Sequence, residues 1–528
     1  MFSAIVLGVF MTEVEVYATT ADFFLNLTKM PSVQLEAKEG RVPSITVDKS
    51  TKYQEVDGFG ASITDGAAWL LSEKLTDQQL QETMEQLFGR EKGIALSFLR
   101  QPIGGTDLST KFFSYDDLCN QTDVACTTPR GVEDKELKRF SISHDRQYII
   151  PMVKKALALN PDMKIMMSPW SPPGWMKSSG NMIGWDHVNN NESVLLPEYY
   201  DSHANYIRKA IQAYEAEGIS IYAMTIQNEP MFAPNNYGGM LMVAENQAIY
   251  IKKFLAPTFQ KANLKTKIML YDHNWDLPSY PESILNDNEA FDLVVGTAWH
   301  HYAGYPKVMS EVKAKYPQKD HWITEASSWK DETSEATMEM VAIELIDVMR
   351  NYARSYIKWG LAIDQNGQPH TGGCPNCVGI VTVNGTVPEN IVVQKTFDYY
   401  ALGHASKFLY KKAVRIDSNE DGKVHNVAFL NTDGSVVLYT YNQDKEDQKI
   451  VVKVGEKSFE ATVKAEAITT FVWKSDKMST GALVGIICGS VAGVAAVIIF
   501  VICCIKFKWC QKKHNEERTQ FIDNEINK

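Results

Sequence analysis

Two glutamates occupy positions where a pair of carboxylates could work together. Glu229 lies in an Asn-Glu-Pro sequence after a short apolar run, and Glu325 lies in a Thr-Glu-Ala sequence after another. Two carboxyl groups about 5 Å apart perform retaining glycoside hydrolysis: one is the nucleophile, and the other protonates the leaving oxygen and later deprotonates water. Pro230 restricts the residue before it to extended backbone, so we expect the Glu229 carboxyl to project from a strand end. A lone glutamate at the end of a strand more often caps a helix or pairs with an arginine. Retaining hydrolysis therefore requires a fold that brings Glu229 and Glu325 together.

The elements that position these glutamates repeat one pattern between Asp57 and His404. Short β-rich apolar runs, each ending in polar or aromatic residues, alternate with helical stretches. Eight runs are predicted to be strands: Gly58 to Thr64, Ile94 to Pro102, Lys164 to Trp170, Ile221 to Gln227, Lys267 to Tyr271, Leu293 to Trp299, His321 to Thr324 and Tyr356 to Ala362. The predicted helices include Thr76 to Phe88 with a Thr76/Gln79 capping box, Arg146 to Leu159, Glu198 to Ala216, Ala244 to Ala262 and Met338 to Tyr352.

This alternation favours a (β/α)8 TIM barrel, in the α/β class, over residues 57–404. An open doubly wound sheet fits less well because no Gly-rich phosphate turn follows the first strand. In such a barrel the active site lies at the C-terminal ends of the strands. Glu229 and Glu325 follow the fourth and seventh predicted strands, which places both at that end.

The regions on either side of the barrel have the alternating, turn-punctuated pattern of β structure. We expect residues 31–56 and 405–474 to form one β-sandwich domain from both ends of the chain. The chain has 528 residues, 45% of them hydrophobic, and a net charge of -11. This composition excludes a disordered chain or a small disulfide scaffold, and the absence of a basic stripe excludes nucleic acid as a partner.

Both ends of the chain carry signs of a membrane protein. Residues 1–18 contain a short apolar run and a small-residue site at Ala18, and we interpret them as a signal peptide. After a linker at 475–480, residues 481–505 carry no charge, which predicts a transmembrane helix rather than a buried soluble helix. The lysines that follow place tail 506–528 in the cytoplasm, so we expect a single-pass type I protein whose catalytic domain is lumenal or extracellular, at the lysosome or cell surface. A GxxxG face suggests a homodimer; it consists of Gly481, Gly485, Gly489 and Gly493.

The cysteines and sequons before the span fit an oxidising compartment. We expect local disulfides in two short loops, Cys119 with Cys126 and Cys374 with Cys377, although the second pair also reads as a redox or zinc motif. The N-glycosylation sequons begin at Asn26, Asn120, Asn191 and Asn384. No metal site is expected, since neighbouring His300 and His301 would face opposite sides of a strand.

Several motifs together resemble glycoside hydrolase family 30, the glucosylceramidase family. The similarity extends from about Val33 to Lys474, and its motifs are Asp57-Gly-Phe-Gly-Ala-Ser-Ile-Thr-Asp65, Phe98-Leu-Arg100, Ser168-Pro-Trp-Ser-Pro-Pro173, Gln227-Asn-Glu-Pro230 and Thr324-Glu-Ala326. The resemblance implies that Glu229 is the acid/base and Glu325 the nucleophile, and it implies no cofactor. It also implies a group of sugar-binding residues, Asp107, Trp170, Asn228 and Trp359 in the -1 subsite with Arg100, His300 and Tyr302 near the nucleophile.

The chemistry of these side chains agrees with the implied roles. Asn228 can donate to a sugar 2-OH, and tryptophan faces suit the C–H face of a pyranose. Arg100 and Tyr302 would keep Glu325 ionised, and we expect Glu229 to stay protonated because a second nearby anion is unfavourable. Ordinary packing for the tryptophans and a structural ion pair for Arg100 are the alternatives.

These residues favour a membrane-tethered retaining β-glycosidase that hydrolyses a β-glucoside or glycosphingolipid such as glucosylceramide. Three departures from the glucosylceramidase pattern, Gln227, Ser327 and Gly360, leave the aglycone open. An endo-β-1,6-glucanase or β-xylosidase acting on polysaccharide is therefore one alternative. A catalytically dead carbohydrate-binding surface receptor is the other.

Overall fold

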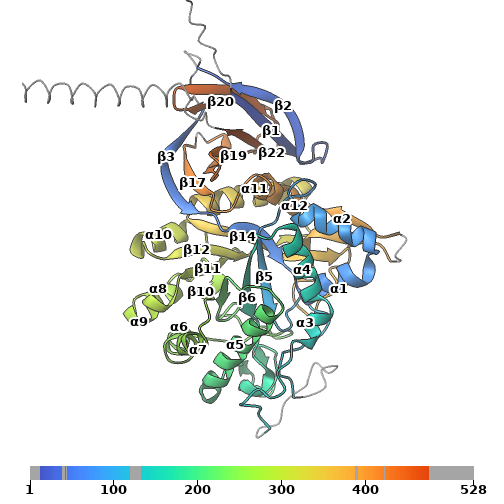
Figure 1. The fold of residues 1–528 in the computed structure, drawn as a ribbon, viewed down its shortest axis with the longest axis vertical. Helices are drawn as coiled ribbons and strands as arrows, with labels where there is room; N and C mark the ends of the chain where they lie inside the picture. The colour runs from blue at the N-terminus through green and yellow to red at the C-terminus, as the bar shows by residue number, and fades with distance from the viewer. Residues whose placement is uncertain are drawn as a thin grey trace, which may run out of the picture. The chain divides into compact units, whose positions relative to one another are not determined.

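The eight strands predicted for the barrel form a closed parallel ring in the computed structural model (Figure 1). The structure describes residues 12–37, 42, 44–118, 132–386, 390–420 and 422–474. The ring contains β4 (Gly58–Ser62), β5 (Phe98–Ile103), β6 (Lys164–Pro169), β9 (Ala223–Thr225), β10 (Lys267–Asn274), β11 (Gly296–His300), β12 (Asp320–Glu325) and β14 (Ala353–Asp364). It closes because β14 pairs in parallel with both β12 and β4. The prediction of a TIM barrel is confirmed.

Helices surround this ring and connect its strands (Figure 1). They are α1 (Asp65–Lys74), α2 (Asp77–Phe88), α3 (Ser143–Gln147), α4 (Ile149–Leu159), α5 (Tyr200–Ala216), α6 (Ala244–Tyr250), α7 (Ala256–Lys261), α8 (Ser279–Leu285), α9 (Asn288–Leu293), α10 (Lys307–Lys315), α11 (Ser334–Arg350) and α12 (Phe397–Ser406). The capping box of Thr76 and Gln79 starts α2 as predicted. The predicted helix from Ala244 to Ala262 consists of α6 and α7 joined by a π-helical turn, η3 (Ile251–Leu255).

Shorter elements lie in the loops of the barrel. They are the 3-10 turns η1 (Gly174–Met176) and η2 (Pro197–Tyr199) and the strands β7 (Trp185–Asp186), β8 (Asn191–Glu192), β13 (Ser328–Trp329), β15 (Cys377–Asn384) and β16 (Val392–Lys395). β15 pairs with β14 on one side and with β16 and β13 on the other, so it extends the barrel wall beyond the nucleophile-bearing end of β12.

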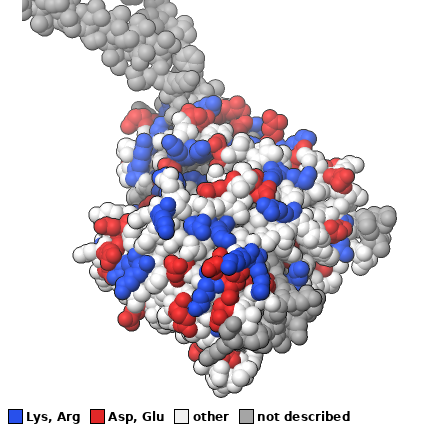
Figure 2. Space-filling view, turned by 60° about the horizontal axis from the view of Figure 1, so that its bottom comes forward, with Lys and Arg blue, Asp and Glu red and all other residues white. Residues whose placement is uncertain are grey.

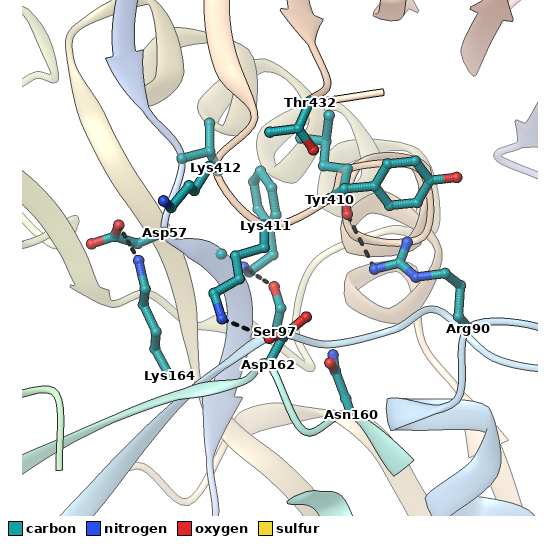
Figure 3. Close-up of a pocket in the computed structure, with 14 residues that line it drawn as sticks. Asp57, Arg90, Ser97, Asn160, Asp162, Lys164, Tyr410, Lys411, Lys412 and Thr432 are labelled. Carbon is teal, nitrogen blue, oxygen red and sulfur yellow. Dashed lines mark hydrogen bonds and ion pairs between the residues drawn. The ribbon is translucent and has the colours of Figure 1, made fainter. Parts of the chain in front are cut away.

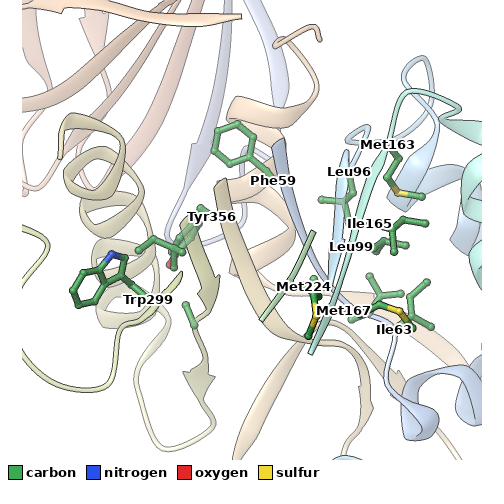
Figure 4. Packing of buried hydrophobic residues seen from close by; sticks show 14 of the residues in the cluster. Phe59, Ile63, Leu96, Leu99, Met163, Ile165, Met167, Met224, Trp299 and Tyr356 are labelled. Atoms are coloured by element: carbon green, nitrogen blue, oxygen red, sulfur yellow. The ribbon is translucent and has the colours of Figure 1, made fainter. Parts of the chain in front are cut away.

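The alternation of side chains along each strand decides which residues enter the barrel. On β6, Met166 packs inside the barrel, whereas Ile165 and Met167 belong to the layer between strands and helices. Figure 4 shows this outer layer, where Ile165 lies beside Leu99 of the neighbouring strand β5. The next inward position on β5 after Phe98 is Arg100. The alternation therefore directs a charged side chain into the interior near the C-terminal end of the barrel.

A nine-stranded sheet packs beside the barrel and contains both ends of the described chain. Its strands are β1 (Thr12–Thr20), β2 (Thr28–Leu35), β3 (Ile45–Glu55), β17 (Val414–Ser418), β18 (Val424–Leu430), β19 (Ser435–Asn442), β20 (Gln448–Val454), β21 (Lys457–Val463) and β22 (Ala467–Lys474). The two edge strands meet through a bridge between Glu36 and Ser458, which closes the sheet around its own core. The predicted β-sandwich domain from both chain ends is confirmed.

The interior strand β19 separates two hydrophobic cores. Val436 and Leu438 point into the sandwich, whereas Val437 and Tyr439 join the core shared with the barrel helices. Helices α11 and α12 lie between the sheet and the barrel (Figure 1). The sandwich therefore packs on the barrel through a buried apolar face.

The first strand corrects the predicted N-terminal boundary. A signal peptide ending at Ala18 does not fit the structure, because β1 runs through that residue and pairs with β22 from Val14 to Thr20. Val14 and Val16 are part of the sandwich core. The N-terminal contribution to the sandwich therefore begins at Thr12 rather than at residue 31.

Several predictions concern residues outside the described ranges: the transmembrane helix at 481–505, its glycine face, the linker and tail, and the loop that holds Cys119, Asn120 and Cys126. Among the described residues, no helix combines the length and apolarity that a membrane crossing requires. Cys374 and Cys377 form a disulfide bond, as predicted. The sequon residues Asn26, Asn191 and Asn384 are exposed.

Candidate active site

Glu229 and Glu325 meet at the C-terminal end of the barrel. Glu325 is the last residue of β12, and Glu229 follows the end of β9. One oxygen from each carboxylate and one nitrogen of His300 all lie within 4.8 Å of one another. Carboxyl groups are about 5–5.5 Å apart in retaining glycosidases and about 6.5–9.5 Å apart in inverting ones, where a water must fit between them. The separation here fits the retaining arrangement.

The backbone of Glu229 differs from the extended conformation expected before proline. Its φ is +48°, in the left-handed region that non-glycine residues seldom adopt. Two hydrogen bonds hold this turn: Asn228 N–H donates to the carbonyl of Pro169 at 2.9 Å, and Glu229 N–H donates to that of Asp272 at 2.9 Å. Strained residues persist where their surroundings fix them, and they cluster at functional sites.

Arg100 is the central cation of the site. Its guanidinium is fully buried and pairs with Glu325, and it also donates to Asp272 at 2.9 Å and to Asn228 at 2.7 Å. Burial opposes a charged guanidinium, but Asp272 and Glu325 more than compensate, so the pKa of Arg100 is raised. Tyr302 donates to the other Glu325 oxygen at 2.8 Å. Arg100 and Tyr302 therefore each hold one oxygen of the Glu325 carboxyl group.

Asp272 is a site residue that the sequence did not predict. It is fully buried and accepts hydrogen bonds from Ser168 at 2.7 Å, Thr225 at 2.6 Å and Thr324 at 2.6 Å in addition to Arg100. Burial would raise the pKa of this carboxyl, but Arg100 and His300 hold it well below the usual value. A permanent buried anion therefore fixes the two cations of the site.

A β-bulge directs Asp272 into the barrel. Tyr271 and Asp272 have φ angles of +72° and +68°, and the register with β11 shifts between Tyr271 and His273. Leu270 and Tyr271 consequently both face the outer layer, and the next residue turns inward. Strict alternation would have pointed Asp272 outward, so the sequence pattern of this strand contained no sign of its role.

His300 joins the acid/base to this buried anion. Its Nδ1 lies 3.2 Å from Glu229 Oε1, and its Nε2 lies 2.9 Å from Asp272 Oδ1. Burial lowers the pKa of the imidazole, but Glu325, Asp272 and the hydrogen bonds to Asp272 and Glu229 raise it to about 9. Burial alone would raise the pKa of Glu229, but the hydrogen bond and charge of His300 outweigh burial, so the pKa of Glu229 is lowered. The expectation of a protonated Glu229 in the resting site is therefore not supported: the proton is shared by the Glu229–His300 pair and lies mainly on His300.

Glu229, His300 and Glu325 have the composition of a metal-ligand set. Their contacts argue against that role, because each His300 nitrogen already faces a carboxylate and Arg100 already neutralises Glu325. Both ring nitrogens act as donors only in a protonated histidine, which cannot ligate a metal. His301, just beyond the end of β11, pairs with Glu344 of α11 and accepts a hydrogen bond from Ser327 N–H at 2.8 Å.

The residues implied for the -1 subsite line one cavity of about 340 Å³. The rings of Trp170 and Trp359 stack with centroids 4.6 Å apart, and the Trp359 indole donates to Asp107 at 3.1 Å. Burial, reinforced by Glu325, raises the pKa of Asp107 to about 7. The cavity contains residues predicted from the sequence and others that were not: Asp107, Trp170, Asn228, Glu229, Tyr302, Glu325 and Trp359, together with Phe232, Tyr237, His273, Asn274, Trp329 and Cys374.

Another cavity, of about 350 Å³, lies at the opposite, N-terminal end of the barrel strands (Figure 3). There Asp57 pairs with Lys164 at 2.5 Å, and Asp162 pairs with Lys411 at 2.6 Å. Active sites of TIM barrels lie at the other end, and this end serves stability. On the molecular face in Figure 2, basic and acidic side chains are interspersed, without a continuous basic stripe.

Comparisons with known proteins agree with this geometry. Residues 56–409 match the model of the glycosyl hydrolase family 30 TIM-barrel domain, and residues 412–471 match that of the family 30 beta sandwich domain. The chain is 31% identical over 444 residues to the endo-1,6-beta-D-glucanase BGN16.3 of Trichoderma harzianum, with 80% of this chain and 85% of the relative covered. It is 30% identical over 461 residues to the putative glucosylceramidase 4 of Caenorhabditis elegans, with 81% and 83% covered. The solved structure of the endo-beta1,6-glucanase BT3312 is similar with a TM-score of 0.75 at 28% identity, covering 88% of this chain and 100% of that one.

Proposed function

The chain belongs to glycoside hydrolase family 30 and is a glycoside hydrolase, and we propose that it cleaves β-1,6-linked glucan with retention of anomeric configuration. The observation that carries the mechanism is the Glu229–Glu325 separation, because oxygens within 4.8 Å leave no room for the water of an inverting enzyme. The enzyme class also argues against a catalytically dead receptor.

In the first step, an oxygen of Glu325 attacks the anomeric carbon while Glu229 gives its proton to the departing oxygen. The glycosidic bond breaks, the leaving group departs as an alcohol, and the sugar is held as an ester of Glu325. In the second step, Glu229 takes a proton from water, whose oxygen displaces Glu325. Arg100 and Tyr302 stabilise the carboxylate before attack and after release, and Asn228 is placed by Arg100 to contact the sugar 2-OH.

The relatives support a glucan substrate. The Trichoderma relative and the solved BT3312 structure are both named as endo-1,6-β-glucanases. The expectation of glucosylceramide thus gives way to the polysaccharide alternative as our leading proposal. Glucosylceramide remains the second candidate, because the putative glucosylceramidase of Caenorhabditis elegans matches over a similar length. A membrane tether at 481–505, if present, would favour that candidate and a lumenal or extracellular site of action.

Substitution of the two glutamates tests the mechanism. We expect Glu325→Gln to abolish both turnover and labelling by a mechanism-based β-glucoside inactivator. Glu229→Gln should still be labelled but should turn over at least a hundredfold more slowly on substrates with poor leaving groups. Proton NMR of the first product should show the β-anomer. The appearance of the α-anomer would contradict the mechanism.

A substrate panel tests the linkage. Protein that includes residues 12–474 is incubated with β-1,6-glucan, xylan and glucosylceramide in detergent micelles, and the products are separated by chromatography. We expect cleavage of β-1,6-glucan at the highest kcat/KM. Cleavage of glucosylceramide alone would replace the glucan proposal with the second candidate.

A further inference from the structure

The loop that follows the acid/base places a large aromatic side chain at the mouth of the cavity. Phe232 N–H donates to the carbonyl of Glu229 at 2.9 Å, so the two residues share one tight turn. The Phe232 side chain is 47% exposed and lines the cavity. The ring lies 6.5 Å from the ring of Tyr237, which lines the same cavity, and its exposed part faces water beside the catalytic group.

The position of this ring is fixed by the loop beneath it. Met242 N–H donates to the carbonyl of Pro230 at 2.7 Å, and Trp185 N–H donates to that of Pro234 at 2.8 Å. Pro234 packs so closely on Gly184 that a Cβ there would lie 2.4 Å from its ring. The backbone on both sides of Phe232 is therefore held against neighbouring segments, and the exposure of the ring is a property of the fold.

Polar groups without partners lie near the same ring. Within the part of the chain that the structure describes, the Tyr237 hydroxyl makes no hydrogen bond, although Glu229, Asp107 and Glu325 are close enough to add to the effect of burial in raising its pKa. The Asn274 side chain uses its oxygen to accept from Tyr302 N–H, and its amide nitrogen has no acceptor among the described residues. Both residues line the cavity with Phe232. One exposed ring and two free donors suit a sugar as the leaving group. The two alkyl chains of a ceramide would leave both donors without acceptors.

We propose that Phe232, Tyr237 and Asn274 form a subsite for a sugar leaving group. Glu229 protonates the leaving oxygen, so the residue three positions along its turn lies on the leaving-group side of the scissile bond. Phe232 stacks on the C–H face of the departing pyranose, and Tyr237 and Asn274 donate to its hydroxyls. This inference rests on the proposed glucan hydrolysis and adds how the leaving sugar is recognised.

The experiment compares two substrates that place the same kind of glucosyl unit on Glu325 and have different leaving groups. Gentiotriose releases a sugar, whereas β-glucosyl fluoride releases fluoride, which has no ring to stack. We expect Phe232→Ala to lower kcat/KM for gentiotriose roughly tenfold and to leave that for the fluoride within twofold. Phe232→Tyr should restore the gentiotriose value. Met231→Ala is the matched control, since Met231 is 38% exposed in the same loop but does not line the cavity, and it should change neither value.

Transfer to an added sugar provides a second readout, because an acceptor enters through the same subsite. With β-glucosyl fluoride as donor and gentiobiose as acceptor, Phe232→Ala should lower the ratio of transfer product to free glucose. Equal losses on both substrates, or an unchanged ratio, would overturn the subsite. If the unaltered enzyme cleaves the fluoride but not gentiotriose or β-1,6-glucan, it is the proposed function that fails.

Discussion

At the scale of single residues, the catalytic proton belongs to a pair rather than to one carboxyl. His300 contacts both Glu229 and Asp272, and the neighbouring anions raise the pKa of the imidazole to about 9. One proton is bound by Glu229 and His300 together, and it must reach the leaving oxygen through Glu229. The pair therefore retains a usable proton at pH values where an ordinary carboxyl has lost it.

Substitution of His300 with Gln should move the alkaline limb of the kcat/KM profile. In the unaltered enzyme the pair loses its proton near the raised pKa of His300, so activity falls only above about pH 9. Without the imidazole, Glu229 holds the proton alone, and a buried carboxyl loses it at lower pH. This alkaline limb should shift toward acid by about one unit or more, as measured between pH 4 and 10 with gentiotriose, whose sugar leaving group needs the proton. His425→Gln, on the sandwich strand β18, is the control; a limb that stays in place in His300→Gln would contradict the shared proton.

At the scale of elements, the sequence predicts a site residue where the strand that carries it has a regular pattern. Arg100 and His300 lie at regular inward positions, and Glu325 lies in the Thr-Glu-Ala motif at the end of β12, so the sequence indicated these residues. Asp272 departs from that regularity through the bulge in β10. Phe232 and Tyr237 lie in a loop whose path depends on contacts with Trp185 and Met242, far along the chain. Local periodicity carries no information about such contacts.

Three loops meet at Gly373, beside the cavity. A Cβ at this position would lie 2.6 Å from the Asp107 Cβ and 2.9 Å from Tyr237 Cε1. Gly373→Ala should therefore displace Asp107, which receives the hydrogen bond of Trp359, and lower kcat/KM on all β-glucosides about tenfold or more. Gly238→Ala is the matched control, since its nearest contact would be an ordinary 3.6 Å from Ser171 Cβ. Equal activities of the two variants would show that the loops yield without disturbing the sugar site.

At the scale of the whole molecule, the sandwich joins the two ends of the described chain into one sheet. β1 lies between β2 and β22, and its register with β22 runs without interruption from Val14 to Thr20. The sequence indicated the sandwich but assigned most of β1 to a leader, because the residues up to Ala18 follow an apolar run and resemble a small-residue cleavage site. Only the partner strand, more than four hundred residues away, distinguishes them.

We predict that the folded enzyme retains Thr12–Thr20, so N-terminal sequencing of the folded protein recovered from cells should begin at or before Thr12. A chain that starts at Ala21 should be strongly destabilised, whereas one that starts at Thr12 should melt like the full chain. The burial of Val14 and Val16 alone contributes roughly 3–6 kcal/mol, and loss of β1 also exposes the edge of β22. Helix α12 contacts both β22 of the sandwich and β4 of the barrel. The loss of β1 should therefore also disturb the barrel, so that activity and melting temperature fall together. A chain from Ala21 with an unchanged melting temperature would mean that β1 is dispensable and that the leader could end at Ala18 after all.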